Sequence, residues 1–320
     1  MPWAPSNLAT KGALASFHQA MEAGPTFWQN HAQTVASTSA SETFTFPGFI
    51  PAPRQFLGSR QMQDARDFTY TVTNNEYELT MLVNRKSWED DQTGLINARL
   101  AEMGEVWATY KDSLFTTLLA NGNVSGNNGF DGVTFHSDDH SSGTTGLTTD
   151  NNTTSAAATG TVATVSELLA VVDTVRQAFQ GFTDDTGRPY NAMALTNLRA
   201  IVHPTQARAF YELMNQTQVV KDGTSTSITS ASQSNEWGQS MIQGVDVNLY
   251  QASGDSDELY FSALGSNRKP FIYQERTPLE IIIKTDAGDV AENNGVLVLT
   301  RQRYILTYGD PRRSILHTLT

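Results

Sequence analysis

One long stripe of apolar residues constrains the fold of this chain more than any other feature. From Leu95 to Leu119, three or four positions separate Ile96, Leu100, Met103, Trp107, Tyr110, Leu114 and Leu118, the spacing of side chains on one helix face. Asp90 and Asp91 precede it, where acids complement free N–H groups. Asn121-Gly122 follows, a pair that accepts a left-handed cap. The pattern predicts a helix over residues 94–121, in which the stretch from Leu95 to Leu119 would be about 37 Å long at ~1.5 Å per residue.

Two strand-like segments come directly before this helix. Alternation puts Phe68, Tyr70 and Val72 on one face of the first segment, and Tyr77, Leu79, Met81 and Val83 on one face of the second. Asn74-Asn75 between them tolerates the positive φ of a tight turn. The pattern predicts a β-hairpin, and two neighbouring strands of an ordinary sheet are the alternative. A two-stranded ribbon is marginally stable alone, so we favour a projecting arm whose apolar face is covered by a neighbouring subunit.

The run EYELTMLVNRKSWEDDQTGLINARLAEMGEVWATYKDSLFTTLLANG, followed by GFDGVTFHSDDH, resembles the Mu-like phage major head subunit family. Its members show a hairpin, an ED-D-x-G junction, a long helix ending at a leucine pair, an aromatic-Asp-Gly motif and a histidine. The similarity is specific over residues 44–140 and looser afterwards, where RAIVHPTQARAF and LTYGDPRRSIL still fit. The chain departs from the family in having Phe46 and Phe56 where members carry Trp, and in lacking a proline after His140.

This resemblance implies an α+β chain with the Hong Kong 97-type capsid fold, which has an N-terminal arm, an extended hairpin loop, a peripheral domain with a long spine helix, and an axial domain. We expect the arm at residues 1–60, the extended loop at 61–90, the peripheral domain at 91–163 with the spine helix at 94–121 and a polar loop, the axial domain mainly at 164–285, and a C-terminal β segment at 286–320 that returns to the peripheral domain.

The resemblance also implies a function. It indicates the major capsid protein of a tailed bacteriophage or prophage, which self-assembles into hexamers and pentamers of an icosahedral or prolate head around double-stranded DNA. The expected location is the virion, after assembly in the host cytoplasm. Expected partners are copies of the chain itself, a separate scaffolding protein, a portal and a decoration protein. An encapsulin-like compartment shell, which shares the fold but encloses enzymes, is the alternative.

Composition agrees with these expectations. The 21 basic and 33 acidic residues give a net charge of −12, which argues against a primary nucleic-acid binder. DNA would therefore be enclosed without sequence-specific binding, and a negative wall would let it slide. No stretch approaches the ~20 apolar residues of a membrane span, and no membrane partner is expected. The absence of cysteine excludes disulfides and thiolate sites, and the tip, residues 73–76, lacks a lysine for a Lys–Asn cross-link.

Several side chains are candidate contacts between subunits. An amphipathic stretch around Phe17, together with Trp28, predicts an N-terminal arm that docks on a neighbour. Trp88 is expected to anchor the hairpin base against the long helix. Arg312 and Arg313 are expected to pair with acids of an adjacent subunit, or to lie on a solvated strand face. The hairpin would contribute Phe68, Tyr70, Val72, Tyr77, Leu79 and Met81.

The second half of the chain predicts a separate core. Thr164 and Glu167 form a capping box ahead of a helix that ends at Gly181. A strand is expected at residues 198–202 and a helix starting near Pro204. Further strands are expected at residues 245–250, 259–264, 271–273, 279–284 and 295–308. The poorly alternating stretch 296–299 predicts a strand buried on both faces. Residues 150–160 and 222–235 are polar and predict surface loops.

One cluster could carry chemistry. His136, Asp138, Asp139 and His140 lie within five residues and offer ligands for zinc or a similar ion, which would support a metal-dependent hydrolase. A loop rich in Asp and His is more often a solvated turn than a metal site, and no glutamate lies between the two histidines to act as a base. The sequence also lacks a phosphate-cradling glycine loop and a G-x-S-x-G elbow. We therefore expect no catalytic residue and no cofactor.

Overall fold

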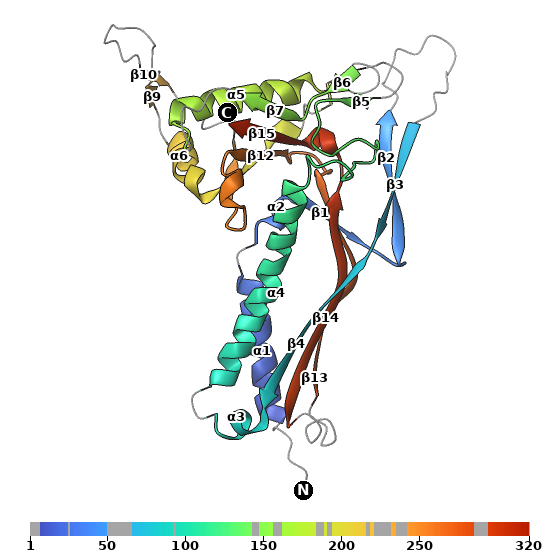
Figure 1. Cartoon of the computed structure of the whole chain (residues 1–320), viewed down its shortest axis with the longest axis vertical. Coiled ribbons are helices and arrows are strands. Elements are labelled where there is room, and N and C mark those ends of the chain that lie inside the picture. Colours follow the sequence, from blue (N-terminus) through green and yellow to red (C-terminus); the bar gives the residue numbers. More distant parts are fainter. Residues whose placement is uncertain are drawn as a thin grey trace, which may run out of the picture.

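The computed structural model describes residues 7–24, 26–49, 66–91, 94–142, 147–155, 162–183, 189–190, 194–215, 218–220, 232–234, 242–284 and 294–319. The molecule is elongated, with a narrow stem below a broader upper lobe (Figure 1). A hairpin of two strands stands beside the junction of the two parts. Within the described ranges, none of the helices has the length and apolar character needed to cross a membrane.

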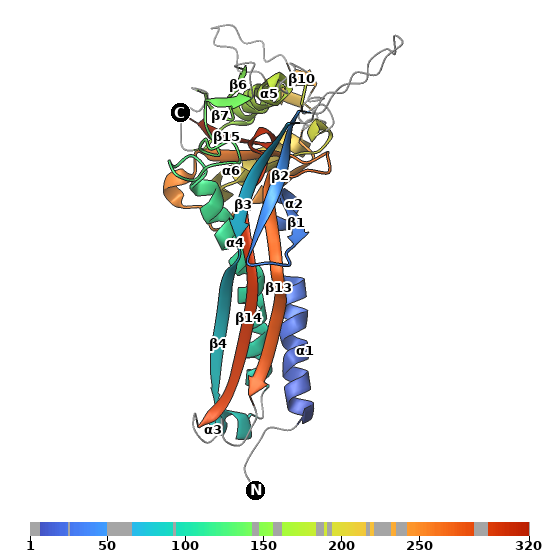
Figure 2. The same ribbon diagram turned by 90° about the vertical axis from the view of Figure 1, so that its right-hand side faces the viewer.

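The stem packs two helices against one sheet. Its elements are α1 (Asn7–Ala23), β1 (Ala32–Ala36), β4 (Asn75–Asn84), α3 (Arg85–Glu89), α4 (Leu95–Ala120), β13 (Phe271–Lys284) and β14 (Gly295–Tyr308). The strand order is β1-β13-β14-β4, with β1 parallel to β13 and the other pairs antiparallel. Helices α1 and α4 run side by side along the sheet, and α3 turns the chain at the foot of the stem (Figure 2).

Helix α4 confirms the predicted long helix, with one change in the stripe. Along its first half it buries Ile96, Leu100, Met103 and Trp107 against α1 and the sheet, as the spacing predicted. In its second half the large apolar side chains that are buried are Phe115 and Leu119, whereas Tyr110 is 41% exposed. The buried face shifts there because the segment containing Phe27 and strand β13 cover that side of the helix, as the edge-on contacts of the Phe115 ring with Phe27 and Phe271 show.

The two ends of α4 differ from each other in how well they were predicted. The Asp91 carboxylate accepts hydrogen bonds from the backbone N–H groups of Leu95 (2.9 Å) and Ile96 (3.2 Å), the role expected of an acid at this end. The predicted left-handed cap at Asn121-Gly122 is wrong, because Asn121 has a φ of −85°. Glycine is required at 122 for space, since a Cβ there would lie 2.5 Å from His136 Nδ1.

The predicted hairpin of residues 67–73 with 76–84 is wrong in its pairing. Strand β3 (Arg66–Thr73) instead pairs antiparallel with β2 (Ser41–Phe49), while β4 pairs antiparallel with β14. Asn74 lies where the chain passes from one sheet to the other, and it makes no hairpin turn. The alternation was read correctly, but it described two consecutive strands that enter different sheets. The apolar face of β4 is covered within the chain, by α4.

The upper lobe contains a five-stranded sheet covered by two helices. Its elements are β7 (Asn152–Ser155), α5 (Val165–Gly181), η2 (Ala194–Thr196), β8 (Leu198–Val202), α6 (Pro204–Asn215), β11 (Gly244–Val247), η3 (Ser253–Asp255), β12 (Glu258–Ala263), η4 (Pro311–Arg313) and β15 (Ser314–Leu319). Two small pairs lie outside this sheet, β5 (His140–Ser142) with β6 (Leu147–Thr149) and β9 (Gln218–Val220) with β10 (Ser232–Ser234). The strand order is β11-β8-β12-β15-β7, and the core lies between this sheet and helices α5 and α6.

Sequence patterns identified most of this lobe. The capping box of Thr164 and Glu167 is present, and α5, β8 and α6 begin where they were expected. Strand β15 falls within the C-terminal β segment expected at residues 286–320, but it was not predicted as a separate strand, and it lies between β12 and β7 in this sheet. The expected boundaries are wrong at the C-terminal end, since β13 belongs to the stem and β15 to the upper lobe. The predicted polar loop at 222–235 lies largely outside the described residues.

Candidate functional site

The loop that carries His136 and His140 uses both rings structurally. His136 is 1% exposed, its Nε2 lies 3.0 Å from Ser314 Oγ, and burial lowers its pKa to about 3. His140 Nδ1 lies 2.6 Å from Asp131 Oδ2, and His140 Nε2 lies 3.1 Å from the carbonyl oxygen of Phe135. Each ring is therefore held by partners outside the predicted cluster.

The structure does not assemble the predicted metal site. Asp138 and Asp139 are exposed, while the two histidines are buried and directed at other groups. Across the described part of the chain, no three His, Asp or Glu side chains are placed to hold a metal ion. The described residues therefore give no support to a metal centre in this loop, or to the metal-dependent hydrolase that would use it.

The junction of stem and upper lobe is organised around the buried carboxylate of Asp246 on β11. It accepts hydrogen bonds from Arg199 Nε and Nη2, both at 2.8 Å, and from Asn30 Nδ2 at 3.0 Å. His31 Nε2 lies 2.9 Å from its second oxygen. Burial alone raises the pKa of Asp246, but the hydrogen bonds from His31 and Arg199 outweigh it and lower the pKa to about 2. Asp246 thereby ties the segment before β1 to the upper lobe.

A second buried acid ties the same segment to the long helix. Asp112 on α4 accepts hydrogen bonds from the backbone N–H groups of Phe27 (3.1 Å) and Trp28 (3.0 Å), at the start of the short helix α2 (Trp28–His31). Burial raises the pKa of Asp112 to about 6. One turn along α4, Thr116 Oγ1 donates to Asn248 Oδ1 of the upper lobe at 2.9 Å. The junction is thus a polar network that joins three parts of the fold.

The base of the β2–β3 hairpin is fixed by Asn74. Its backbone N–H donates to the carbonyl of Ala40 at 3.0 Å, and its side-chain amide donates to Ser37 Oγ at 3.0 Å. Gln274 Nε2 of β13 donates to Asn74 Oδ1 at 2.8 Å. The hairpin therefore projects from an anchored base.

Around η4, two arginines share one aromatic ring. The guanidinium carbon of Arg312 lies 4.0 Å from the ring centroid of Tyr190, and that of Arg313 lies 4.7 Å from it. Arg312 Nε donates to Asp310 Oδ1 at 3.0 Å, and the Tyr190 hydroxyl donates to the other oxygen of Asp310. Arg313 Nε and Nη1 are buried, and no described residue accepts a hydrogen bond from either nitrogen.

Comparison with known families shows to which family this chain belongs. The sequence model of the family described as Mu-like prophage major head subunit gpT matches residues 7–176, just over half of the chain. The chain belongs to the gpT family. The match covers α1, the hairpin, α4 and most of α5, so it includes both the stem helices and the start of the upper lobe.

Two relatives are similar over shorter segments. The major capsid protein of Escherichia phage Mu is 29% identical over 106 residues, which are 33% of this chain and 35% of that protein. The Mu-like prophage FluMu major head subunit of Haemophilus influenzae is 25% identical over 125 residues, which are 39% of this chain and 40% of that protein. The chain thus spans well under half the length of each of these gpT-type relatives.

The similarity of the fold extends much further than that of the sequence. The capsid structure of the cyanophage P-SCSP1u superimposes with a TM-score of 0.60 at 10% identity, and covers 93% of this chain and 89% of that chain. This gpT-family chain therefore has the predicted Hong Kong 97-type α+β capsid fold.

The gpT-family chain itself covers several side chains that were expected at contacts between subunits. Phe17, Trp28 and Val72 are buried within the chain, and Arg312 is buried against its own Asp310 and Tyr190. Their burial leaves little surface for a neighbour, and the contact of these four with another subunit stays a prediction. Arg313 is also buried, so neither a solvated strand face nor an open surface pair describes it.

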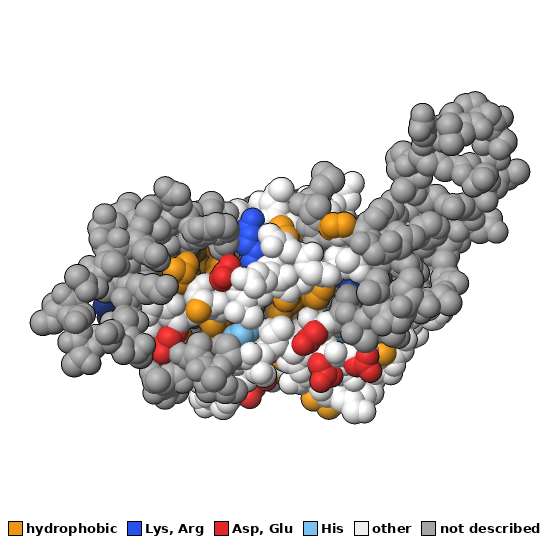
Figure 3. Space-filling model, turned by 90° about the horizontal axis from the view of Figure 1, so that it is seen from above, with side chains coloured by type: hydrophobic (Ala, Val, Ile, Leu, Met, Phe, Trp, Pro, Cys, Tyr) orange, Lys and Arg blue, Asp and Glu red, His pale blue; other side chains and the backbone are white. Residues whose placement is uncertain are grey.

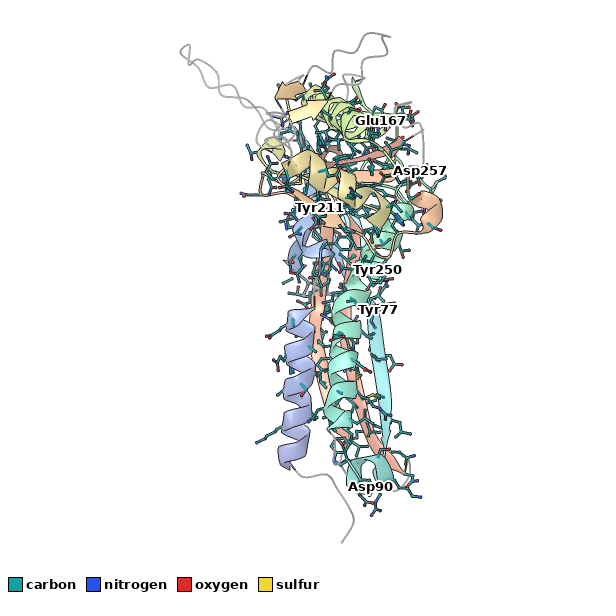
Figure 4. All side chains as sticks on the ribbon, turned by 90° about the vertical axis from the view of Figure 1, so that its left-hand side faces the viewer. Tyr77, Asp90, Glu167, Tyr211, Tyr250 and Asp257 are labelled. Carbon is teal, nitrogen blue, oxygen red and sulfur yellow. The ribbon has the colours of Figure 1, made fainter. Side chains whose placement is uncertain are left out.

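The other predicted contact residues lie on the stem. Tyr77, Leu79, Met81 and Trp88 are half-buried and pack against the stem core, and Tyr77 lies on the flank of α4 (Figure 4). Tyr70, on β3, places its hydroxyl 3.2 Å from Thr307 Oγ1 of β14. The side chain of Phe68 lies outside the described part of the structure.

Sequence analysis missed the surface that the gpT-family stem leaves open. On the face of the stem sheet turned away from α4, Leu82 is 53% exposed and Ile282 is 56% exposed. Leu297 is directly opposite Leu82, and Leu299 is directly opposite Ile282. We call these four residues the outer stem face. The outer stem face could have been predicted from the poor alternation of residues 296–299, because that pattern indicates a strand with apolar side chains on both faces.

Proposed function

We propose that this chain is the major capsid protein of a tailed bacteriophage or prophage, and that it self-assembles into hexamers and pentamers of a head that encloses double-stranded DNA. Membership of the gpT family, over residues 7–176, is the observation that carries the proposal. The capsid fold over 93% of the chain supports it. The chain would then be a component of the virion, assembled in the host cytoplasm.

The physical properties of the structure support a structural role and not an enzymatic one. A shell subunit needs surface that other copies can bury. The stem sheet carries apolar side chains on both faces, and its own helices cover only one of them. The outer stem face therefore offers area for a neighbouring copy. The buried acids of the junction, Asp246 and Asp112, are used to hold the fold together, since they accept hydrogen bonds from Arg199 and from the backbone of Trp28.

DNA is a cargo in this proposal and not a ligand. The net charge of −12 disfavours tight contact with phosphates. Seen from above, the described surface shows separate basic, acidic and hydrophobic groups and no continuous basic area (Figure 3). A separate scaffolding protein, a portal and a decoration protein complete the proposed set of partners.

Electron microscopy tests the proposal directly. The full chain would be produced alone and together with a scaffolding protein from the same phage genome, and the particles imaged in negative stain. We expect closed shells with fivefold and sixfold rings of subunits. Monomers or small oligomers under both conditions would contradict a shell-forming role.

The nucleic acid inside native particles separates the two kinds of shell. Double-stranded DNA in particles that carry a portal is expected for a phage head. Particles that enclose enzymes and contain no DNA would instead support the encapsulin-like compartment.

A further inference from the structure

The stem sheet ends on one side at an edge strand that nothing protects. Strand β4 is the last in the order β1-β13-β14-β4, and no described strand pairs with its other edge. Its pairing with β14 is continuous from residue 75 to residue 84, without a register shift, and the strand contains no proline and no lysine. Figure 2 shows β4 at the margin of the stem. Every second residue of an antiparallel edge strand points its N–H and C=O groups outward, so β4 can accept a further strand.

The opposite side of the sheet is protected in ways that β4 is not. The first part of β13, residues 271–275, is covered by the short parallel strand β1. Beyond it, β13 contains Pro278, two register shifts in its pairing with β14, and a terminal Lys284. Proline, irregular pairing and lysine are features that prevent a strand edge from pairing with another chain. The contrast indicates that the edge of β4 is the one available to another strand.

An apolar groove of about 270 Å³ runs beside the edge of β4. Its lining residues come from β4 and α4 and are Tyr77, Glu78, Leu79, Val106, Trp107 and Tyr110. Because Glu78 points to the opposite face of β4 from Tyr77 and Leu79, the groove reaches the edge itself. Val106 is 53% exposed and Tyr110 is 41% exposed, so an added strand would cover apolar area as well as pair its backbone.

We propose that β4 pairs antiparallel with β4 of a second copy of this chain, across a twofold axis that passes through Thr80. On this axis Thr80 faces Thr80 of the other copy. Leu79 then faces Met81 on the side of the groove, and Glu78 faces Leu82 on the other side. The two stem sheets would thereby become one continuous sheet.

The sequence of β4 itself favours a second copy as the occupant. A strand added here must place apolar side chains toward the groove and must not bring acids opposite Glu76 and Glu78. In the proposed register Tyr77 faces Val83 and Glu76 faces Asn84, so β4 meets both conditions. A contact that uses the same edge of both copies also leaves neither edge open. The inference rests on the proposed shell function, which brings many copies of the chain together.

Single cysteine variants of the full chain test the pairing, because the chain has no cysteine of its own. Thr80→Cys is expected to form an intermolecular disulfide in shells under mild oxidation, since facing residues of antiparallel strands have Cα atoms about 4.5–5.5 Å apart. Glu78→Cys and Leu82→Cys should form several-fold less, because neither residue faces itself. Tyr211→Cys, on an exposed side chain of the upper lobe, is the control for random oxidation. Non-reducing gel electrophoresis measures the fraction of linked dimer.

A charge at the same position tests the contact without a cross-link. Thr80 is exposed, so Thr80→Lys should leave the thermal midpoint of the unassembled subunit unchanged. It should lower the urea concentration at which shells dissociate, because two like charges would face each other. Equal dimer fractions from all four cysteine variants, or none from Thr80→Cys, would overturn the pairing. Weakened Thr80→Lys shells without a Thr80→Cys dimer would mean that a strand of different sequence covers the edge.

The unassembled subunit separates this inference from the proposed function. If the wild type forms no shells, the same oxidation is carried out on the subunit at high concentration. A dimer that is specific to Thr80→Cys would then support the pairing of β4 although the shell function fails. The absence of that dimer would overturn the pairing as well.

Discussion

At the scale of single residues, the junction depends on acids whose partners are far away in the sequence. Asp246 and His31 are separated by 215 positions, and Asp112 and Trp28 by 84. No local pattern indicates such pairs, so the sequence analysis predicted no contact between these residues. The capping box of α5 was found because its two residues lie one turn apart and follow a local rule.

Asp246→Asn should weaken the junction strongly. The variant keeps the shape of the side chain but removes the charge that accepts from Arg199 and His31. Breaking a buried ion pair by removing one partner costs about 3 kcal/mol. Urea unfolding of the unassembled subunit measures this loss. Glu212→Gln is the control, because its pair with Arg208 is exposed to solvent and contributes little to stability. Equal effects of the two variants would show that Asp246 does not organise the junction.

His136 should make the fold sensitive to acid. Burial lowers its pKa to about 3, below the ordinary 6.5 of the unfolded chain. Between these values the unfolded state binds a proton that the folded state does not, so stability falls as pH falls, by about 1.4 kcal/mol per pH unit. His136→Gln should therefore lose less stability than the wild type between pH 6 and pH 4.

The effect of His136 is measured as the difference between the variant and the wild type, because protonation of Asp112 changes stability in the opposite direction as pH falls. The pKa of Asp112 is raised to about 6, so protonation of this acid favours the folded state as pH falls below that value. Thermal midpoints of both proteins across the range separate the two effects. Parallel pH profiles would mean that His136 is not held neutral in the fold.

At the scale of elements, periodicity identified the elements but not all of their partners. Helix α4 and strand β8 were correctly predicted because each has a strong local pattern. The pairing of β3 with β4 was wrong because alternation shows which side chains share a face, not which strand lies alongside. The partner of β4 is β14, more than 200 residues later in the chain, and contacts across that distance leave no local signal.

The packing of α1 on α4 depends on a glycine that no sequence rule explained. A Cβ at Gly104 would lie 2.4 Å from the backbone oxygen of Phe17, so the two helices can approach closely only if this position has no side chain. Gly104→Ala should destabilise the subunit by about 1–3 kcal/mol, which outweighs the ~1 kcal/mol that alanine gains in helix propensity. Thermal or urea unfolding measures the change.

Gly12→Ala is the matched control in the partner helix. A Cβ at Gly12 meets nothing within 4 Å, so only the gain in helix propensity applies. This variant should be stabilised by about 0.5–1 kcal/mol. Opposite signs for the two substitutions are expected, and a stabilised Gly104→Ala variant would contradict the close contact of α1 with α4.

At the scale of the whole molecule, the stem is a sheet with one face covered by its own helices and one face open. Tyr77 belongs to the covered face, where its ring lies 4.5 Å from that of Tyr304. Changing it to Asp would damage the stem itself, so this residue is a poor test of assembly. Leu82 and Ile282 point away from α4, so charges can be placed there without opening the core.

The double variant Leu82→Asp/Ile282→Asp should fold as a subunit and fail to form stable shells. Both side chains are more than half exposed, so the free energy of unfolding of the unassembled subunit should change by no more than about 0.5 kcal/mol. Burial of two carboxylates in a contact between copies would be costly, so shells should be lost or should dissociate in mild urea. Tyr211→Asp on α6, where the side chain is 47% exposed and lies in the upper lobe away from the stem, is the control (Figure 4). Shells of normal stability from the double variant would show that the outer stem face stays in contact with solvent after assembly.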